Sequence, residues 1–305
     1  MDEPEPVAAD GEAIVRVRAC GLCGSDRSCY ATGVFAPVVL GHEIAGELEA
    51  DAGELRAGEL VVVDPKIPCG RCTDCKNDAE HRCVESLTRG IGAGRSGGFA
   101  ERVAVPESCL HRVPAGLETH VACLAEPLSC VLHGLDRVEM RAGEDAIVIG
   151  LGPIGLLTVV ALRARGASRI VGIDPLPARR ALALALGADE AVEPGMLHDQ
   201  TSLVVEASGT AAAMRIAGNL AVAGGRVLLI GVPMDEVMMT PLVWVSREVS
   251  LVGSIASKHS DVDRALAMLV QKPSLAAIVT DRIPLEAVPA AMAEPPIGGK
   301  IVVVP

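Results

Sequence analysis

The chain has 305 residues, of which half are hydrophobic, with 27 Lys and Arg against 39 Asp and Glu. This composition predicts about two folded domains and excludes an intrinsically disordered chain. The net charge of −12, with one Trp, one Tyr and two Phe, argues against nucleic-acid binding and against an anionic membrane surface. We therefore expect no nucleic-acid partner and no membrane partner.

The N-terminal part has the pattern of an irregular, mostly β domain. Residues 12–18 alternate between apolar and polar side chains and predict a half-buried strand, and residues 60–63 predict another. From there to about residue 118 the chain is rich in Gly, Pro and Cys, with short apolar runs such as residues 102–105.

After Glu126 short apolar strands alternate with helical segments, which predicts a doubly wound parallel sheet and an α/β fold class. The predicted strands are 146–150, 169–174, 203–206, 226–230 and 251–253, and the predicted helices are 153–165, 178–186 and 210–220. Residues 174–202 are too few for a full passage of two helices and a strand, so we expect one helix to be reduced. The last 45 residues predict a helix (261–270), a strand (278–282), a helix (285–292) and a terminal strand (300–304).

Four of the ten cysteines have the spacing of a zinc site. The acidic start without an apolar leader predicts a cytoplasmic protein, in which clustered cysteines bind metal rather than form disulfides. Four thiolates spaced C-x2-C-x2-C-x7-C can surround zinc tetrahedrally and leave no open position, so the predicted role is structural. These ligands are Cys69, Cys72, Cys75 and Cys83; His81, in the same stretch, is the alternative ligand.

A second, more dispersed set of residues offers one thiolate, one imidazole and two carboxylates. These are Cys23, His42, Glu43 and Glu126, and the mix suits a zinc ion held by three protein groups with an open fourth position. Which carboxylate binds directly stays open. Asp26 is a candidate acceptor for orienting His42.

A glycine-rich hexapeptide predicts dinucleotide binding. Its residues Gly150, Gly152, Pro153, Ile154 and Gly155 follow a predicted strand and open a predicted helix, which is where a pyrophosphate binds. Asp174 closes the next strand, accepts the ribose hydroxyls and repels a 2′-phosphate, so we expect NAD rather than NADP. Arg179 and Arg180 are the counter-argument, because a nearby Arg can accommodate that phosphate.

These segments, in this order, resemble the zinc-dependent medium-chain alcohol dehydrogenases. The resemblance rests on CGLCGSD, GHEIAGE, the four cysteines, GGFAE, AEPLSC, GLGPIG, EASG and GGKIVVV, and AEPL is similar to the polyol (sorbitol)/threonine dehydrogenase branch. It implies a GroES-like β-barrel catalytic domain over 1–125 and a Rossmann NAD-binding domain over 126–257. A C-terminal segment, 258–305, would return to the catalytic domain.

The resemblance also implies roles for individual residues. Cys23 and His42 would be ligands of a catalytic zinc, with Glu43 and Glu126 sharing or alternating as its carboxylate. Ser25 would hydrogen-bond the substrate oxygen and pass on its proton. Arg179 would lie beside Asp174, and Lys300 near the pyrophosphate.

Other implications concern the relay and assembly. Many relatives place a relay His where this chain has Ser28, so the proton path differs. A homodimer or homotetramer is implied, with residues 243–253 as the candidate edge strand.

The expected activity is oxidation of a small secondary alcohol, polyol-like, to a ketone with two zinc ions per chain and NAD. One alternative is a biosynthetic dehydrogenase of an aminocyclitol or sugar alcohol, and another is a non-catalytic protein that binds zinc and NAD. The remaining histidines are expected as surface or packing residues rather than ligands, namely His111, His120, His133, His198 and His259. The remaining cysteines are expected as small buried hydrophobes, namely Cys20, Cys29, Cys109, Cys123 and Cys130.

Overall fold

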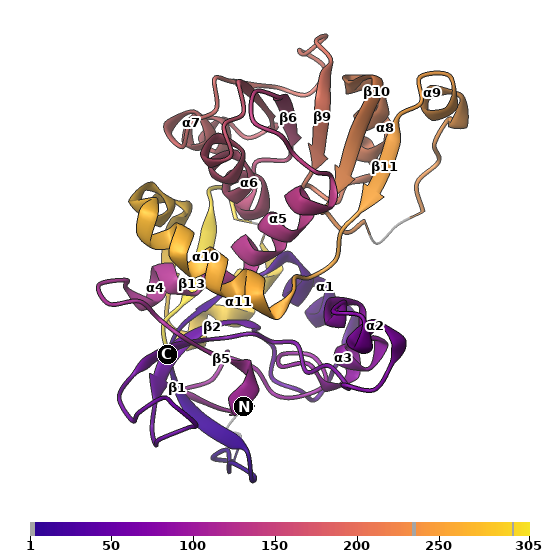
Figure 1. The fold of residues 1–305 in the computed structure, drawn as a ribbon. Coiled ribbons are helices and arrows are strands. Elements are labelled where there is room, and N and C mark those ends of the chain that lie inside the picture. Colours follow the sequence, from indigo (N-terminus) through magenta and orange to yellow (C-terminus); the bar gives the residue numbers. More distant parts are fainter. Residues whose placement is uncertain (1–3, 234–235, 295) are drawn as a thin grey trace. The chain divides into compact units, whose positions relative to one another are not determined.

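The computed structural model describes residues 4–233, 236–294 and 296–305, which form two compact units (Figure 1). Unit 1 takes the chain up to Ser129 and resumes with Lys258–Pro296 and Lys300–Pro305. Unit 2 consists of Cys130–Ser257 and Ile297–Gly299. The domain boundaries predicted from the sequence fall after residues 125 and 257.

Unit 1 is built on a seven-stranded sheet around strand β1 (Glu12–Gly21). The order is β12-β13-β1-β2-β3-β5, and β4 also pairs with β1. Every pairing is antiparallel except that of β12 with β13. The other strands are β2 (Glu43–Leu48), β3 (Leu60–Val63), β4 (Arg102–Pro106), β5 (Leu110–Arg112), β12 (Val279–Ile283) and β13 (Lys300–Val303).

Strand β1 carries the predicted alternation and then departs from it. Val15 and Val17 are buried in the core of unit 1, whereas Arg16 and Arg18 are exposed, as expected for a strand with one covered face. Between Val17 and Ala19 the pairing with β2 shifts register, and from there to Gly21 every residue is buried. This buried end of β1 leads directly into the segment that holds Cys23.

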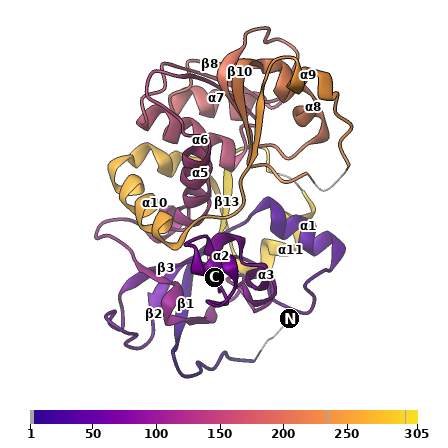
Figure 2. The same ribbon diagram turned by 45° about the vertical axis from the view of Figure 1, so that its right-hand side comes forward.

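The helices of unit 1 are short except for one. The cysteine-rich lobe holds α2 and α3, which lie side by side in both views (Figures 1 and 2). The predicted helix over 285–292 begins only at Val288, because residues 285–287 form a 3-10 turn. The helices are α1 (Gly24–Thr32), α2 (Thr73–Lys76), α3 (Val84–Arg89), α4 (Thr119–Ala122), the start of α5 (Ala125–Arg137), α10 (His259–Gln271) and α11 (Val288–Ala293).

Unit 2 contains a six-stranded sheet in the order β11-β10-β9-β6-β7-β8, with all neighbours parallel. This confirms the predicted doubly wound sheet. The strands are β6 (Asp145–Ile149), β7 (Arg169–Ile173), β8 (Glu190–Val192), β9 (Thr201–Glu206), β10 (Ala221–Leu229) and β11 (Ser250–Gly253). The helices are α6 (Pro153–Ala164), α7 (Pro177–Ala185), α8 (Ala211–Leu220) and α9 (Pro241–Val245).

Two further expectations can be compared with unit 2. The fully described stretch 193–200, between β8 and β9, forms no helix, which confirms that one helix of this passage is reduced. Strand β10 begins five residues earlier than predicted, at Ala221, with a register shift before Arg226.

Among the described residues, no helix has the length and apolar character needed to cross a membrane.

Candidate active site

The four clustered cysteines converge in unit 1. The Sγ atoms of Cys72 and Cys75 are 3.4 Å apart, those of Cys69 and Cys75 are 4.0 Å apart, and all four lie within 4.8 Å of one another. Four sulfurs at about 2.3 Å from one zinc ion would be about 3.8 Å apart. The donor set therefore fits a tetrahedral zinc ion, as the spacing predicts, and His81 is not part of the group.

Backbone amides prepare these sulfurs for a metal. The N–H of Cys72 donates to the Sγ of Cys69, that of Cys75 to the Sγ of Cys72, and that of Cys69 to the Sγ of Cys83. Such donors stabilise a thiolate, and those of Arg71 and Cys72 lower the pKa of Cys69 to about 7. The short helix α2 starts from Cys72 and so fixes two of the four ligands.

A second centre is assembled from two separated segments of unit 1. Cys23 is the N-cap of α1, His42 precedes β2, and Glu43 is the first residue of β2. A sulfur of Cys23, a ring nitrogen of His42 and a carboxylate oxygen of Glu43 lie within 4.8 Å of one another, and Glu126 is outside this group. The geometry therefore favours Glu43 as the directly binding carboxylate.

Asp26 holds His42 in the expected way. Its Oδ1 lies 3.1 Å from His42 Nδ1, and its Oδ2 accepts the backbone N–H of Cys23 at 2.9 Å. Burial opposes the charge on Asp26, but His42 and the Cys23 amide outweigh it and lower the pKa of the carboxyl. Burial would lower the pKa of His42, but Asp26 and Cys23 raise it well above the usual value. A carboxylate on one ring nitrogen leaves the other for a metal and increases its basicity.

Glu43 supplies the observation that a metal would explain. Its carboxylate is fully buried, and Oε2 has no hydrogen-bond partner in the structure. The neighbouring residue, Gly21, leaves the space that this oxygen fills, because a Cβ there would lie 1.9 Å from Oε2. A buried carboxylate oxygen without a partner is costly, and a cation beside Cys23 and His42 would satisfy it. The residues present therefore fit a zinc ion.

Lys300 is not where the resemblance placed it. Its side chain is 2% exposed, and its Nζ donates to Glu43 Oε1 at 2.5 Å and to the carbonyl of Leu22 at 3.2 Å. Burial disfavours the ammonium, but Glu43 raises the pKa of Lys300 and keeps it charged. We correct the expectation of a pyrophosphate contact, because the amine is used inside unit 1. The sequence places Lys300 in a terminal strand and gives no signal of this pairing.

The remaining predicted residues of this centre lie close by but make no direct ligand set. Glu126 is in the first turn of α5, and burial raises the pKa of its carboxyl despite the opposing effect of His42. Ser25 is exposed in the first turn of α1. Ser28, at the family's relay position, donates to the carbonyl of Gly24 at 3.4 Å.

The predicted cofactor loop of unit 2 has the required conformation. Gly150 has a φ of +87°, and a Cβ on Gly155 would lie 1.8 Å from the carbonyl oxygen of Gly150. Gly152 is the N-cap of α6, Pro153 is its first residue, and Ile154 follows it. The backbone N–H groups at the N-terminus of this 12-residue helix, and the positive end of its dipole, are therefore available to an anion.

Asp174 is tied to this loop. Its side chain is 2% exposed, Oδ2 accepts the N–H of Leu151 at 2.8 Å, and Oδ1 accepts that of Leu176 at 2.9 Å. Arg179 Nη1 lies 3.6 Å from Asp174 Oδ2, beside Gly152, as the resemblance implied. Arg180 instead pairs with Glu193 at 2.9 Å. Asp174 therefore also positions the glycine-rich loop, which the sequence analysis did not anticipate.

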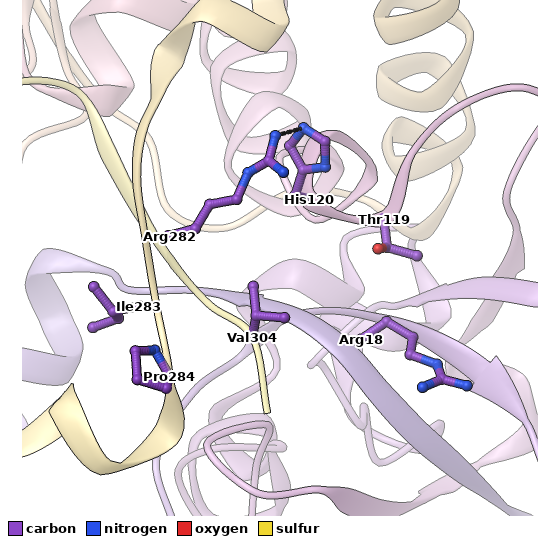
Figure 3. A pocket seen from close by; sticks show the side chains of 7 residues that line it. All are labelled: Arg18, Thr119, His120, Arg282, Ile283, Pro284 and Val304. Carbon is purple, nitrogen blue, oxygen red and sulfur yellow. Dashed lines mark hydrogen bonds between the residues drawn. The ribbon is translucent and has the colours of Figure 1, made fainter.

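A cavity of about 410 Å³ in unit 1 lies apart from every predicted site residue (Figure 3). Arg282 reaches across it to His120, with Nη2 2.5 Å from His120 Nε2. Arg18, on its other side, is paired with Glu47 at 2.7 Å. Both arginine side chains that line the cavity therefore already have partners within unit 1.

Comparison with known proteins defines the family. Residues 9–115 match the family "Alcohol dehydrogenase GroES-like domain", and residues 153–271 match "Zinc-binding dehydrogenase". The chain is 36% identical to D-altritol 5-dehydrogenase from Agrobacterium fabrum, over 90% of this chain and 86% of that one. The chain belongs to the zinc-type medium-chain alcohol dehydrogenases. This confirms the resemblance and the GroES-like and Rossmann classes of its two parts.

Other relatives agree with the polyol/threonine branch. Sorbitol dehydrogenase from Bombyx mori is 31% identical, over 93% of this chain and 85% of that one. A protein described as a zinc-binding dehydrogenase from Sinorhizobium meliloti 1021, bound to NADP, superimposes with a TM-score of 0.90. It is 32% identical and the match covers 98% of this chain and 94% of that one.

Proposed function

We propose that this zinc-dependent dehydrogenase oxidises a secondary hydroxyl group of a polyol-like substrate to a ketone, with NAD as acceptor. The observation that carries the proposal is the buried Glu43 oxygen without a partner beside Cys23 and His42, in a chain that also holds a preformed dinucleotide loop. The polyol class is supported by the relatives that act on altritol and sorbitol.

In this mechanism the substrate loses a proton and a hydride. Cys23, His42 and Glu43 would hold the zinc ion, which when bound would supply Lewis-acid chemistry that lowers the pKa of a hydroxyl group. NAD, when bound, would supply the hydride acceptor. Asp26 fixes the His42 ring, and Lys300 binds Glu43 Oε1 and leaves Oε2 without a hydrogen-bond partner. Together these contacts keep three donors converged before substrate arrives.

The proton has two candidate acceptors among the residues of unit 1. Ser25 is exposed two residues after Cys23 and can pass a proton to solvent. Glu126 has a raised carboxyl pKa, so it can exchange a proton nearer neutral pH than an ordinary Glu. We assign the first transfer to Ser25 and a supporting, water-mediated role to Glu126.

The preference for NAD is proposed from Asp174. Its negative charge lies at the end of β7 and disfavours a 2′-phosphate, and Arg180, one of the two arginines that could offset it, pairs with Glu193. Arg179 remains the group that would admit NADP.

We also propose a homodimer formed through strand β11. This strand is at the end of the parallel sheet, and β10 is its partner among the described strands. Leu251 on β11 and Leu242 and Val245 on α9 are exposed apolar residues next to that edge. Light scattering should give twice the monomer mass, and a monomeric mass would contradict this proposal.

The decisive experiment measures NAD reduction over polyols, threonine, aminocyclitols and simple secondary alcohols, with zinc content determined on the same sample. Turnover should be highest with a polyol and should vanish in Cys23→Ser, while NADH binding is retained. Zinc-loaded protein that binds NADH but reduces no NAD with any member of the panel would refute the proposed activity.

A further inference from the structure

Three residues outside every predicted metal site meet in unit 1. Asp64 directly follows β3, His111 is in β5, and His259 is the first residue of α10. His259 Nδ1 lies 3.2 Å from His111 Nε2 and 3.1 Å from Asp64 Oδ2. The three donor atoms all lie within 4.8 Å of one another, and none of the residues belongs to the two zinc centres described above.

Each donor is aimed by a separate contact. Asp263 Oδ1 lies 2.7 Å from His111 Nδ1, and because a carboxylate only accepts, Nδ1 carries the hydrogen and the Nε2 lone pair points at His259. Lys66 Nζ contacts Asp64 Oδ1, which leaves Oδ2 for the cluster. A carboxylate behind a metal-binding imidazole is the usual support of such a ligand.

His259 is fixed through its backbone. Its N–H donates to Glu80 Oε1 at 3.0 Å, and the capping box of Lys258 and Asp261 sets the start of α10. Asp64 and His111 are 2% and 3% exposed, whereas the side chain of His259 is 49% exposed. Two donors are therefore rigid and buried, and the third lies at the solvent edge, where an ion can enter.

The charges around the cluster favour a divalent cation. Asp64, Asp263 and Glu80 contribute three carboxylates, and Lys66 contributes one ammonium in direct contact. Two imidazoles with one carboxylate are a donor set of transition metals such as zinc, whereas magnesium and calcium prefer oxygen alone. His259 Nδ1 lies within hydrogen-bond distance of both His111 Nε2 and Asp64 Oδ2, and a metal ion would take the place of the hydrogen between these donors.

We propose that Asp64, His111 and His259 bind a divalent transition-metal ion, with zinc as the expected one, in a third site of the chain. The ion would join β3 and β5 to α10, which begins the segment of the chain that returns to unit 1 (Figure 2). Because it binds the folded arrangement, it would stabilise unit 1, by an amount that rises with the logarithm of the free metal concentration once that concentration exceeds the dissociation constant.

The first test counts metal ions after saturation with zinc and gel filtration. The unaltered protein should hold three ions per chain, and His259→Ala and His111→Ala should each hold two. His198→Ala is the matched control, because His198 is an exposed histidine outside the cluster, and it should hold three. His259→Ala keeps the test valid if His111→Ala misfolds, since its side chain is half exposed. Two ions in the unaltered protein, or three in both cluster variants, would overturn the proposal.

The second test identifies the ligands. Cobalt added to protein whose two thiolate sites already hold zinc should give d–d absorption without a thiolate-to-cobalt charge-transfer band. Asp263→Asn should weaken this cobalt binding by about 10- to 100-fold, because His111 loses its charged support. A charge-transfer band, or unchanged affinity in both Asp263→Asn and His111→Ala, would show that the ion binds elsewhere and would refute the assignment.

Discussion

The two thiolate centres of unit 1 differ in how their ligands are brought together. Cys69, Cys72, Cys75 and Cys83 lie within 15 residues, and the turns between them supply both the sulfurs and the N–H donors. Cys23, His42 and Glu43 come from two segments held by a buried β1–β2 pairing. The first centre can form locally, whereas the second requires the folded sheet.

The two centres also differ in their surroundings. The four-cysteine site has ligands of one kind, and four of them would leave a bound zinc ion no open position, so we propose that it only stabilises the lobe. The other centre mixes a thiolate, an imidazole and a carboxylate, and it is backed by Asp26 and Lys300. Three donors would leave the fourth position of a bound zinc ion open. On this contrast we base the proposal that one site serves stability and the other serves chemistry.

The largest test of this contrast compares Cys83→Ser with Cys23→Ser. Both variants should lose one of the thiolate-bound zinc ions. Cys83→Ser should lower the free energy of unfolding by about 4–5 kcal/mol, because loss of a structural metal is among the most costly changes. Cys23→Ser should change stability far less but remove turnover. Denaturant unfolding and NAD reduction, measured with zinc content, check both outcomes.

Cys29→Ser provides the control for the replacement of a thiol by a hydroxyl group, because Cys29 lies in α1 but in neither ligand group. The Cys29→Ser variant should retain both thiolate-bound zinc ions and near-normal unfolding. If Cys83→Ser and Cys23→Ser lost stability equally, the division into a structural and a chemical site would be wrong.

The contrast also explains how much could be predicted from sequence. The parallel sheet and the cysteine lobe depend on local periodicity and spacing, and both were predicted. The helix α1 was not predicted, because its sequence is polar and its start depends on Cys23 as N-cap. The early start of β10 was missed because Gly224 and Gly225 interrupt the apolar run.

Two of the missed side-chain contacts join segments that are distant in sequence. Lys300 reaches Glu43 across 257 residues and His259 reaches Asp64 across 195. Residues this far apart cannot be paired from the local periodicity of a helix or strand. In the sequence, Lys300 is indistinguishable from any other residue of a terminal strand. Motifs indicated the candidate ligands, but only the register of β1 with β13 brings Lys300 beside Glu43.

Gly21→Ala tests how closely the chemical centre is packed. The new Cβ would lie 1.9 Å from Glu43 Oε2, and Lys300 holds the other oxygen in place. We expect a loss of up to about 3 kcal/mol in stability together with weaker zinc binding at this centre alone. Gly253→Ala is the control for zinc affinity, because Gly253 lies in unit 2 and its Cβ would meet nothing within 4 Å in the chain. Normal zinc affinity and stability in Gly21→Ala would show that Glu43 is not held as described.

Asp26→Asn tests the support behind His42. The oxygen of the neutral amide can still accept a hydrogen bond from His42, but the negative charge beside the imidazole is lost. The NH2 group would also point its hydrogens at the N–H donor of Cys23 or Gly41. Zinc affinity of this centre should fall about 10- to 100-fold, while the four-cysteine site keeps its ion. Competition with a chelator, followed by zinc analysis, measures the two sites separately. Equal weakening of both sites would contradict the independent construction of the two centres.

The cofactor loop combines residues that are contiguous in sequence with one residue from a separate segment. Asp174→Asn tests the contribution of that separate residue. The glycines are contiguous, whereas Asp174 comes from the end of β7 and binds the N–H groups of Leu151 and Leu176. Removing its charge should shift the ratio of kcat/KM for NAD over NADP by about tenfold towards NADP, or about 1.4 kcal/mol. Asp199→Asn, an exposed change in unit 2, should leave the ratio unchanged. An unchanged ratio with weaker binding of both cofactors would mean that Asp174 acts by shaping the loop, so that cofactor choice would have to come from Arg179.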